Sequence, residues 1–153
     1  MPKPLWAPWR LEYIEAADDS DGCPFCDAEP ALLVHRGERA NVLLNKFPYA
    51  SGHLIVAPAR HLGDFGGLED DEAAEIHTLA QRGVAALTEE YAPQGFNLGW
   101  NLGRMAGAGI VDHIHLHVVP RWGGDTNFMP VLADVRVLPE ALADSQRRLS
   151  AHF

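Results

Sequence analysis

The sequence predicts an α+β domain, an antiparallel sheet of about five strands with helices on one face. Three observations lead to this prediction. Three short aliphatic segments follow one another in the first half of the chain, a long helical pattern covers residues 70–91, and two more strand-like segments come after it. Strands in a group, then a helix, then further strands are typical of an antiparallel sheet covered on one side.

The N-terminal segment is expected to precede the sheet. Three prolines among residues 1–9 predict an extended start, residues 9–17 a short helix, and residues 18–30 an irregular, turn-rich stretch. We expect residues 1–153 to form one domain, with residues 1–30 as an arm and residues 31–153 as its core, because the length suits a single domain.

The strands are predicted from β-branched and aliphatic residues between turn-forming flanks, over residues 32–36, 41–45, 53–57, 96–102 and 113–119. The helix over residues 70–91 has an acidic first turn, which suits the positive end of the helix dipole, and an apolar residue every three or four positions. A second helix is expected to run from Pro139 to about His152.

Charge and composition exclude several classes of function. The formal net charge is -9 and only two residues are lysine, so the chain lacks the clustered cations that bind long nucleic acid. No apolar run approaches the roughly 18 residues of a membrane helix, and the N-terminus has no signal-peptide pattern. With two cysteines and no signal, we expect a cytoplasmic protein. A small phosphorylated substrate remains compatible with these features.

The segment from His113 to Val119 reads His-Ile-His-Leu-His-Val-Val. On a strand, its three histidines share one face and its aliphatic residues the other. One metal ion held by all three is disfavoured, because His113 and His117 would lie about 13 Å apart while zinc–nitrogen bonds are about 2 Å. The alternative is a division of labour, in which one imidazole attacks or takes a proton and its neighbours orient it or protonate a leaving group.

Both cysteines lie in Cys23-Pro24-Phe25-Cys26. A redox motif of the thioredoxin type needs a strand before it and a helix after it, whereas the flanks here are turn-like. A disulfide is disfavoured in a reducing compartment. A structural zinc ion needs two further ligands, and the spacing alone does not choose them.

The histidine segment matches the signature of the histidine triad (HIT) superfamily, His-φ-His-φ-His-φ-φ, where φ is hydrophobic. Residues 45–58 resemble the ribose-binding strand of that family with its supporting histidine, and residues 101–109 resemble its phosphate loop. Residues 6–14 and 120–129 are similar to the bacterial branch that includes diadenosine tetraphosphate phosphorylases. The resemblance implies a HIT-like fold.

The resemblance also implies roles for individual residues. His115 corresponds to the nucleophile, which attacks the α-phosphate of a nucleotide and forms a covalent nucleotidyl-histidine. His117 corresponds to the residue that contacts the phosphates and assists the leaving group, and His53 to the buried histidine that supports the nucleophile. Asn45 corresponds to the residue that holds the ribose hydroxyls.

The predicted phosphate loop includes Asn101, Gly107 and Gly109, whose amide and backbone groups could face an anion. The loop is one residue longer than the common family pattern, with Ala108-Gly109 in place of the usual Gln-Ser. For the metal, the resemblance favours a structural zinc ion, with no organic cofactor. Its implied ligands are Cys23, Cys26, His61 and His113.

The leading functional hypothesis is a nucleotide hydrolase or nucleotidyltransferase that cleaves a dinucleoside polyphosphate. Water as the acceptor gives hydrolysis and phosphate gives phosphorolysis, which the sequence does not separate. The alternatives are a nucleoside phosphoramidase, a nucleotide-binding module with weak turnover, and a metalloenzyme that uses the triad as ligands. By family analogy, we expect a homodimer formed by extension of the sheet.

Overall fold

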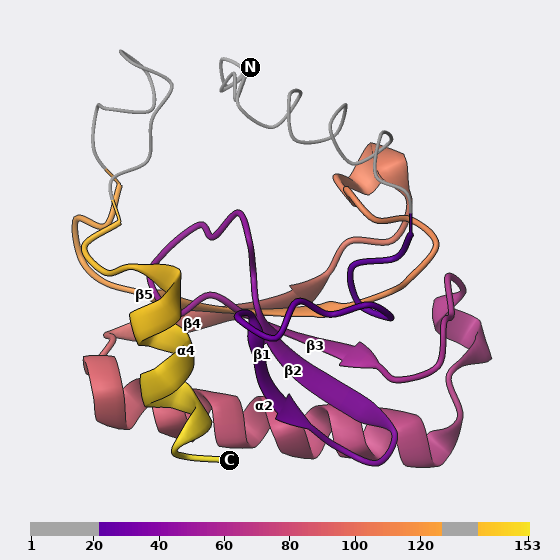
Figure 1. Cartoon of the computed structure of the whole chain (residues 1–153). Helices are drawn as coiled ribbons and strands as arrows, with labels where there is room; N and C mark the ends of the chain where they lie inside the picture. Colours follow the sequence, from indigo (N-terminus) through magenta and orange to yellow (C-terminus); the bar gives the residue numbers. More distant parts are fainter. Residues whose placement is uncertain (1–21, 127–137) are drawn as a thin grey trace, which may run out of the picture.

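The structure, a computed structural model, describes residues 22–126 and 138–153 (Figure 1). In these residues one antiparallel sheet has the strand order β1-β2-β3-β5-β4. Its strands are β1 (Leu33–Arg36), β2 (Ala40–Leu44), β3 (Leu54–Pro58), β4 (Gly95–Trp100) and β5 (Leu116–Arg121). The α-helices are α2 (Asp70–Tyr91) and α4 (Leu142–Ser150), and two short 3-10 helices are η1 (Phe65–Gly67) and η2 (Arg104–Ala106). The predicted α+β fold is confirmed, whereas the helix expected at residues 9–17 lies outside the described residues.

The two faces of the sheet contact different parts of the chain. Alternate residues such as Val42, Val56 and Val118 are buried in one cluster with apolar residues of α2 and α4. The next residues along β2 and β3, Leu43 and Ile55, belong to a second cluster that contains Phe25. Because side chains alternate along a strand, the helices cover one face and the cysteine segment lies against the other (Figure 1).

The strand that carries the histidines begins later than predicted. We expected it to start at His113, but β5 starts at Leu116, and His113 lies in a bend. Two hydrogen bonds outside the sheet ladder hold the irregular stretch before β5. The Ile114 N–H donates to the carbonyl of Leu62, and the His115 ring bonds to the carbonyl of His113. His113 and His115 therefore lie outside the strand, although their rings are on the same side of the sheet as that of His117.

The other bounds differ less from the predictions. The long helix spans residues 70–91 as expected. The C-terminal helix is shorter than predicted and starts after Pro139 and Glu140, whose carboxylate accepts hydrogen bonds from Tyr91, Ser145 and Arg148. β4 ends at Trp100 because the chain turns at Gly103, where φ is 83°.

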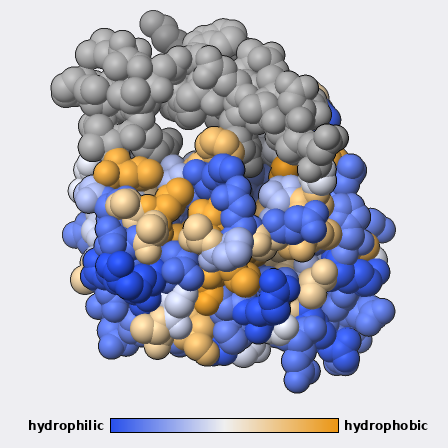
Figure 2. Space-filling view, viewed as in Figure 1, coloured by the Kyte–Doolittle hydropathy of each residue, from blue (hydrophilic) through white to orange (hydrophobic). Residues whose placement is uncertain are grey.

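The surface of the described part is mainly hydrophilic on the face that Figure 2 shows, with small hydrophobic areas between charged side chains. Among residues 22–126 and 138–153, no helix combines the length and the apolar character that crossing a membrane requires.

Gly52 shapes the turn that leads into β3. Its φ is 78°, and a Cβ atom there would lie 2.6 Å from Cδ2 of Leu87. We expect Gly52→Ala to lower the free energy of unfolding by about 1–3 kcal/mol, through backbone strain and overpacking. Urea unfolding measures this, with Gly95→Ala as the control, because a Cβ at Gly95 meets nothing within 4 Å. Equal effects of the two substitutions would contradict the prediction.

Glu72 links the start of α2 to the chain that follows β3. Its buried carboxylate accepts hydrogen bonds from Arg60 and from the Glu69 N–H. These bonds lower the pKa of Glu72 to about 2, and the bond from Arg60 has the largest effect. The ionised form thus stabilises the fold above the ordinary pKa of 4.5, and this contribution is lost as the pH falls from there toward 2.

We therefore expect Glu72→Gln to cost about 2 kcal/mol of unfolding free energy at pH 7. The difference between wild type and variant should shrink below pH 4. Urea unfolding at pH 7 and near pH 3 checks this, and a pH-independent difference would show that the charge of Glu72 does not matter.

Candidate active site and candidate metal centre

Four histidines gather on the sheet face that points away from α2. His53 precedes β3, His113 and His115 precede β5, and His117 lies in β5 opposite Ile55. His53 and His113 are 0% exposed and His115 is 4% exposed. Buried imidazoles need hydrogen-bond partners, and those partners decide which ring nitrogen carries the proton in each case.

His115 is held with one defined nitrogen available for chemistry. Its Nδ1 lies 2.9 Å from the carbonyl oxygen of His113, so Nδ1 carries the hydrogen and donates it. In the neutral ring, Nε2 then keeps the lone pair. Burial, more than any other influence, lowers the pKa of His115 below its ordinary value of 6.5. The ring is therefore neutral at pH 7 and can act as a nucleophile through Nε2.

His117 is assigned the opposite tautomer by a relay of hydrogen bonds. The Tyr49 N–H donates to Nδ1 of His53 at 3.1 Å, so the proton of His53 is on Nε2. That Nε2 lies 2.9 Å from Nδ1 of His117 and donates to it. The proton of neutral His117 is then on Nε2. His53 was expected to support the nucleophile, and the structure makes His117 its direct partner.

The rings of His115 and His117 thus offer complementary groups side by side. Their centroids are 4.9 Å apart and the ring planes are at 67°. One ring has a lone pair on Nε2 and the other a proton on Nε2. Such a pair can attack an electrophilic atom through one ring and donate a hydrogen bond to the leaving group through the other.

Two asparagines lie beside these rings. Asn45, at the end of β2, is 5% exposed, and its amide Nδ2 lies 3.4 Å from the ring nitrogens of His53, while its Oδ1 accepts from the Phe47 N–H. The amide Nδ2 of Asn101 lies 3.5 Å from Nε2 of His117. The structure therefore brings both predicted nucleotide contacts to the histidine cluster.

The glycine-rich loop after β4 forms a compact turn around η2. Among the residues that the structure describes, the left-handed glycines of this loop are Gly103 and Gly107, with φ of 83° and 96°. The N–H groups of Ala106, Gly107 and Ala108 donate to carbonyls within the loop. Half-buried Gly109 follows. The loop is thus shaped by its glycines, and three of its N–H groups bond inward rather than toward a ligand.

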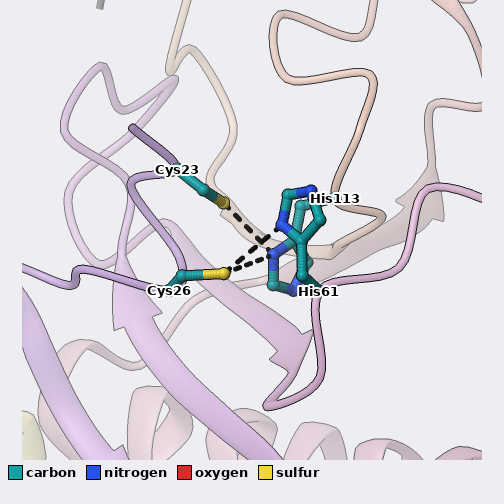
Figure 3. A group of neighbouring side chains, drawn as sticks. All are labelled: Cys23, Cys26, His61 and His113. Carbon is teal, nitrogen blue, oxygen red and sulfur yellow. Dashed lines mark hydrogen bonds between the residues drawn. The ribbon is translucent and has the colours of Figure 1, made fainter. Parts of the chain in front are cut away.

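A second cluster contains the four predicted metal ligands (Figure 3). Nδ1 of His113 lies 3.2 Å from Sγ of Cys23 and 3.5 Å from Sγ of Cys26, and Nδ1 of His61 lies 3.3 Å from Sγ of Cys26. All four ligand atoms lie within 4.8 Å of one another. Tetrahedral zinc with bonds of about 2.3 Å to sulfur and 2.0–2.1 Å to nitrogen separates its ligands by roughly 3.5 Å.

The ring orientation of His113 agrees with a ligand role. Its Nε2 lies 2.8 Å from the carbonyl oxygen of Pro58 and donates to it, which leaves the lone pair of Nδ1 facing the thiols. Desolvation, followed by the hydrogen bond and charge of Cys23, raises the pKa of Cys26 to about 11. The Cys26 thiol therefore resists ionisation, and a bound cation would offset this. The donor set and its spacing fit a closed zinc site.

The family model described as HIT domain matches residues 27–124 of the chain. The chain belongs to the HIT family. Solved HIT structures superimpose on this HIT protein over most of its length. The predicted HIT-like fold is therefore confirmed as well.

Three proteins similar to this HIT protein are a named enzyme and two solved structures. It is 36% identical to a Mycobacterium tuberculosis protein named AP-4-A phosphorylase, over 97% of this chain and 83% of that protein. The crystal structure of a zinc-bound histidine triad family protein from Mycobacterium smegmatis superimposes with a TM-score of 0.69 at 32% identity, covering 86% of this chain and 92% of that one. A hypothetical histidine triad nucleotide-binding protein from Sulfolobus tokodaii gives a TM-score of 0.69 at 25% identity, covering 85% and 91%.

Two residues of this HIT site were not predicted. The ring of Phe25 lies 4.7 Å from that of His115, between centroids, and the ring of Tyr49 lies 4.6 Å from that of His53. Phe25 stands between the two cysteines, and Tyr49 four residues before His53. Both aromatic residues are close in the sequence to predicted site residues, which indicated that they could belong to the site. The sequence does not show which ring an aromatic side chain contacts.

Proposed function

We propose that this HIT protein cleaves dinucleoside polyphosphates through a covalent nucleotidyl-histidine on His115. The observation that supports this most is the complementary pair of tautomers on His115 and His117, set by the carbonyl of His113 and by the relay through His53. The name of the 36% identical relative, AP-4-A phosphorylase, supports the choice of substrate class.

The reaction would take place in two displacements at phosphorus. In the first, the Nε2 lone pair of His115 attacks the α-phosphorus and the bond from that phosphorus to the bridging oxygen breaks, so that the leaving phosphate departs as an anion whose oxygen accepts a hydrogen bond from Nε2–H of His117. In the second, water or inorganic phosphate attacks the same phosphorus and the phosphorus–nitrogen bond breaks. The proton of the attacking group passes to a phosphate oxygen of the product or to solvent, and His115 regains its neutral starting state.

The remaining residues would bind the nucleotide. Asn45 is held against His53 and would hold the ribose hydroxyls, and Asn101 would donate to phosphate oxygens beside His117. Gly107 and Gly109 would shape the loop that closes on the phosphates. Preorganised donors of this kind stabilise charge that develops in the transition state.

The choice between phosphorolysis and hydrolysis needs an experiment with two arms. Purified protein is incubated with diadenosine tetraphosphate, with and without inorganic phosphate, and the products are separated. ADP and ATP formed only with phosphate identify a phosphorylase, whereas AMP and ATP formed without phosphate identify a hydrolase. No cleavage in either arm contradicts the proposal, and a parallel assay with a nucleoside phosphoramidate then tests the phosphoramidase alternative.

We also propose a homodimer in which two sheets join at their β4 edges. β4 is at the end of the strand order, and Leu98 and Leu102 on and after it are 49% and 47% exposed. An edge strand with exposed apolar residues is suited to pairing with another copy. Sedimentation analysis tests this: the mass should be that of a dimer and should fall to that of a monomer in Leu98→Asp, whereas a monomeric wild type contradicts the proposal.

A further inference from the structure

We infer that Phe25 is a positioning residue for His115, and that the candidate metal centre holds Phe25 in place. The segment Cys23–Cys26 would then help to position the catalytic residue in addition to stabilising the fold. This inference rests on the proposed function, because it concerns the residue assigned as nucleophile.

The first contact is between aromatic rings. Phe25 is 8% exposed, its ring centroid lies 4.7 Å from that of His115, and it also meets the ring of His113 edge-on at 5.4 Å. On the sheet, Phe25 packs in one cluster with Leu43 and Ile55. The Phe25 ring therefore fills the space between the sheet and the nucleophile and limits how far the imidazole can turn.

The backbone of Phe25 depends on the two cysteines around it. The N–H groups of Cys26 and Asp27 both donate to the carbonyl of Cys23, at 3.1 Å and 2.9 Å, so Phe25 sits in a tight turn. The segment belongs to no strand or helix of the described part. Ligation by both flanking cysteines would fix the ends of this turn to His61, which follows β3, and to His113, which precedes β5.

A second contact connects the same centre to His115. The carbonyl that accepts the Nδ1–H of His115 belongs to His113, whose ring is fixed between the thiols and the carbonyl of Pro58. The His115 ring is thus held on one side by Phe25, which lies between two of the candidate ligands, and at Nδ1 by His113, which is itself a candidate ligand. If the metal is lost, both the hydrogen bond from Nδ1–H of His115 and the contact with the Phe25 ring should weaken. The His115 ring could then rotate, and Nε2 would no longer be oriented toward the phosphorus atom.

The expected effect is on the chemical step. A displacement of about 1 Å in a reacting group can cost on the order of 100-fold in rate, whereas the nucleotide contacts proposed for Asn45 and the phosphate loop do not use Phe25. Phe25→Ala should therefore lower kcat about 10- to 100-fold and change KM by less than about threefold. Phe25→Leu, which keeps a bulky apolar contact, should recover most of kcat.

The matched control is Leu43→Ala. Leu43 belongs to the same buried cluster and is 3% exposed, so it loses comparable packing, but it has no ring against His115. Both alanine variants should lose stability, and only Phe25→Ala should lose kcat. Metal analysis should find the wild-type zinc content in each variant. A wild-type kcat in Phe25→Ala, or a loss that Leu43→Ala shares, would overturn the inference, as would loss of zinc from Phe25→Ala and Phe25→Leu alike.

A spectroscopic readout separates this inference from the proposed function. Nitrogen-15 NMR of the histidine rings reports the tautomer of His115 without any substrate. Zinc-loaded wild type and Leu43→Ala should show a proton fixed on Nδ1, whereas Phe25→Ala and zinc-stripped wild type should show exchange between both nitrogens. If no dinucleotide is cleaved but these spectra differ as expected, only the proposed function fails. If cleavage occurs and all four spectra agree, only the positioning role fails.

Discussion

His115→Ala is expected to reduce cleavage of diadenosine tetraphosphate on the order of 10³- to 10⁶-fold, because it removes the only group assigned to attack phosphorus. The imidazole is buried and neutral, and its Nδ1 is already committed to the carbonyl of His113. Alanine fits the same backbone, so the fold should persist with a loss of unfolding free energy of about 1–3 kcal/mol. Steady-state assays and urea unfolding measure the two effects.

The control is His77→Ala, which removes an exposed imidazole from α2 and should leave turnover within about twofold of wild type. With substrate labelled at the α-phosphate, wild type should form a labelled protein adduct and His115→Ala should form none. Residual turnover above about a tenth of wild type in His115→Ala would show that another group attacks phosphorus.

His117 can be tested separately from His115 by the choice of leaving group. If Nε2–H of His117 stabilises the departing oxygen, a leaving group that departs as a more stable anion needs this help less. His117→Ala should then lose much less activity on such a substrate than on diadenosine tetraphosphate, whereas His115→Ala should lose both activities equally. Equal losses on both substrates in His117→Ala would assign that residue to binding instead.

The sequence allowed prediction of the elements whose patterns are local. The helix over residues 70–91 and the five strands follow from periodicity and turn residues, which depend on near neighbours. The start of β5 was predicted wrongly, because the alternation of His113 and His115 imitates a strand. The His113 ring contacts the thiols and the carbonyl of Pro58, and the His115 ring packs against Phe25, and periodicity does not register contacts with groups so distant in the sequence.

The contacts within the candidate site join residues that are far apart in the sequence, and local sequence patterns do not show which distant residues meet. Cys23 and His113 are 90 residues apart, and His53 and His117 are 64 apart. His53 and His117 meet because β3 lies next to β5 in the sheet, whereas Cys23 reaches His113 from a segment before β1 that packs on the face of the sheet. The resemblance to the HIT family supplied these groupings at the level of residue types. It did not supply the ring-to-ring order, in which His53 bonds to His117 while His113 supports His115.

Loss of the metal centre is expected to destabilise the fold by several kcal/mol. The four candidate ligands join the cysteine turn to the segments after β3 and before β5, and metal binding to a folded site contributes directly to folding free energy. His61→Ala is the sharpest variant, because His61 is exposed and its removal disturbs little packing. We expect a lower zinc content and a free energy of unfolding about 3 kcal/mol or more below that of wild type.

His77→Ala is again the matched control, as an exposed histidine outside the cluster. With zinc present, unfolding should separate His61→Ala from both His77→Ala and wild type. With a chelator present, all three proteins should converge, because the energy that His61 contributes exists only through the metal. If His61→Ala instead remained as stable as His77→Ala under both conditions, the four residues would be packing partners and not ligands. A difference that persisted unchanged in chelator would assign the contribution of His61 to its own contacts.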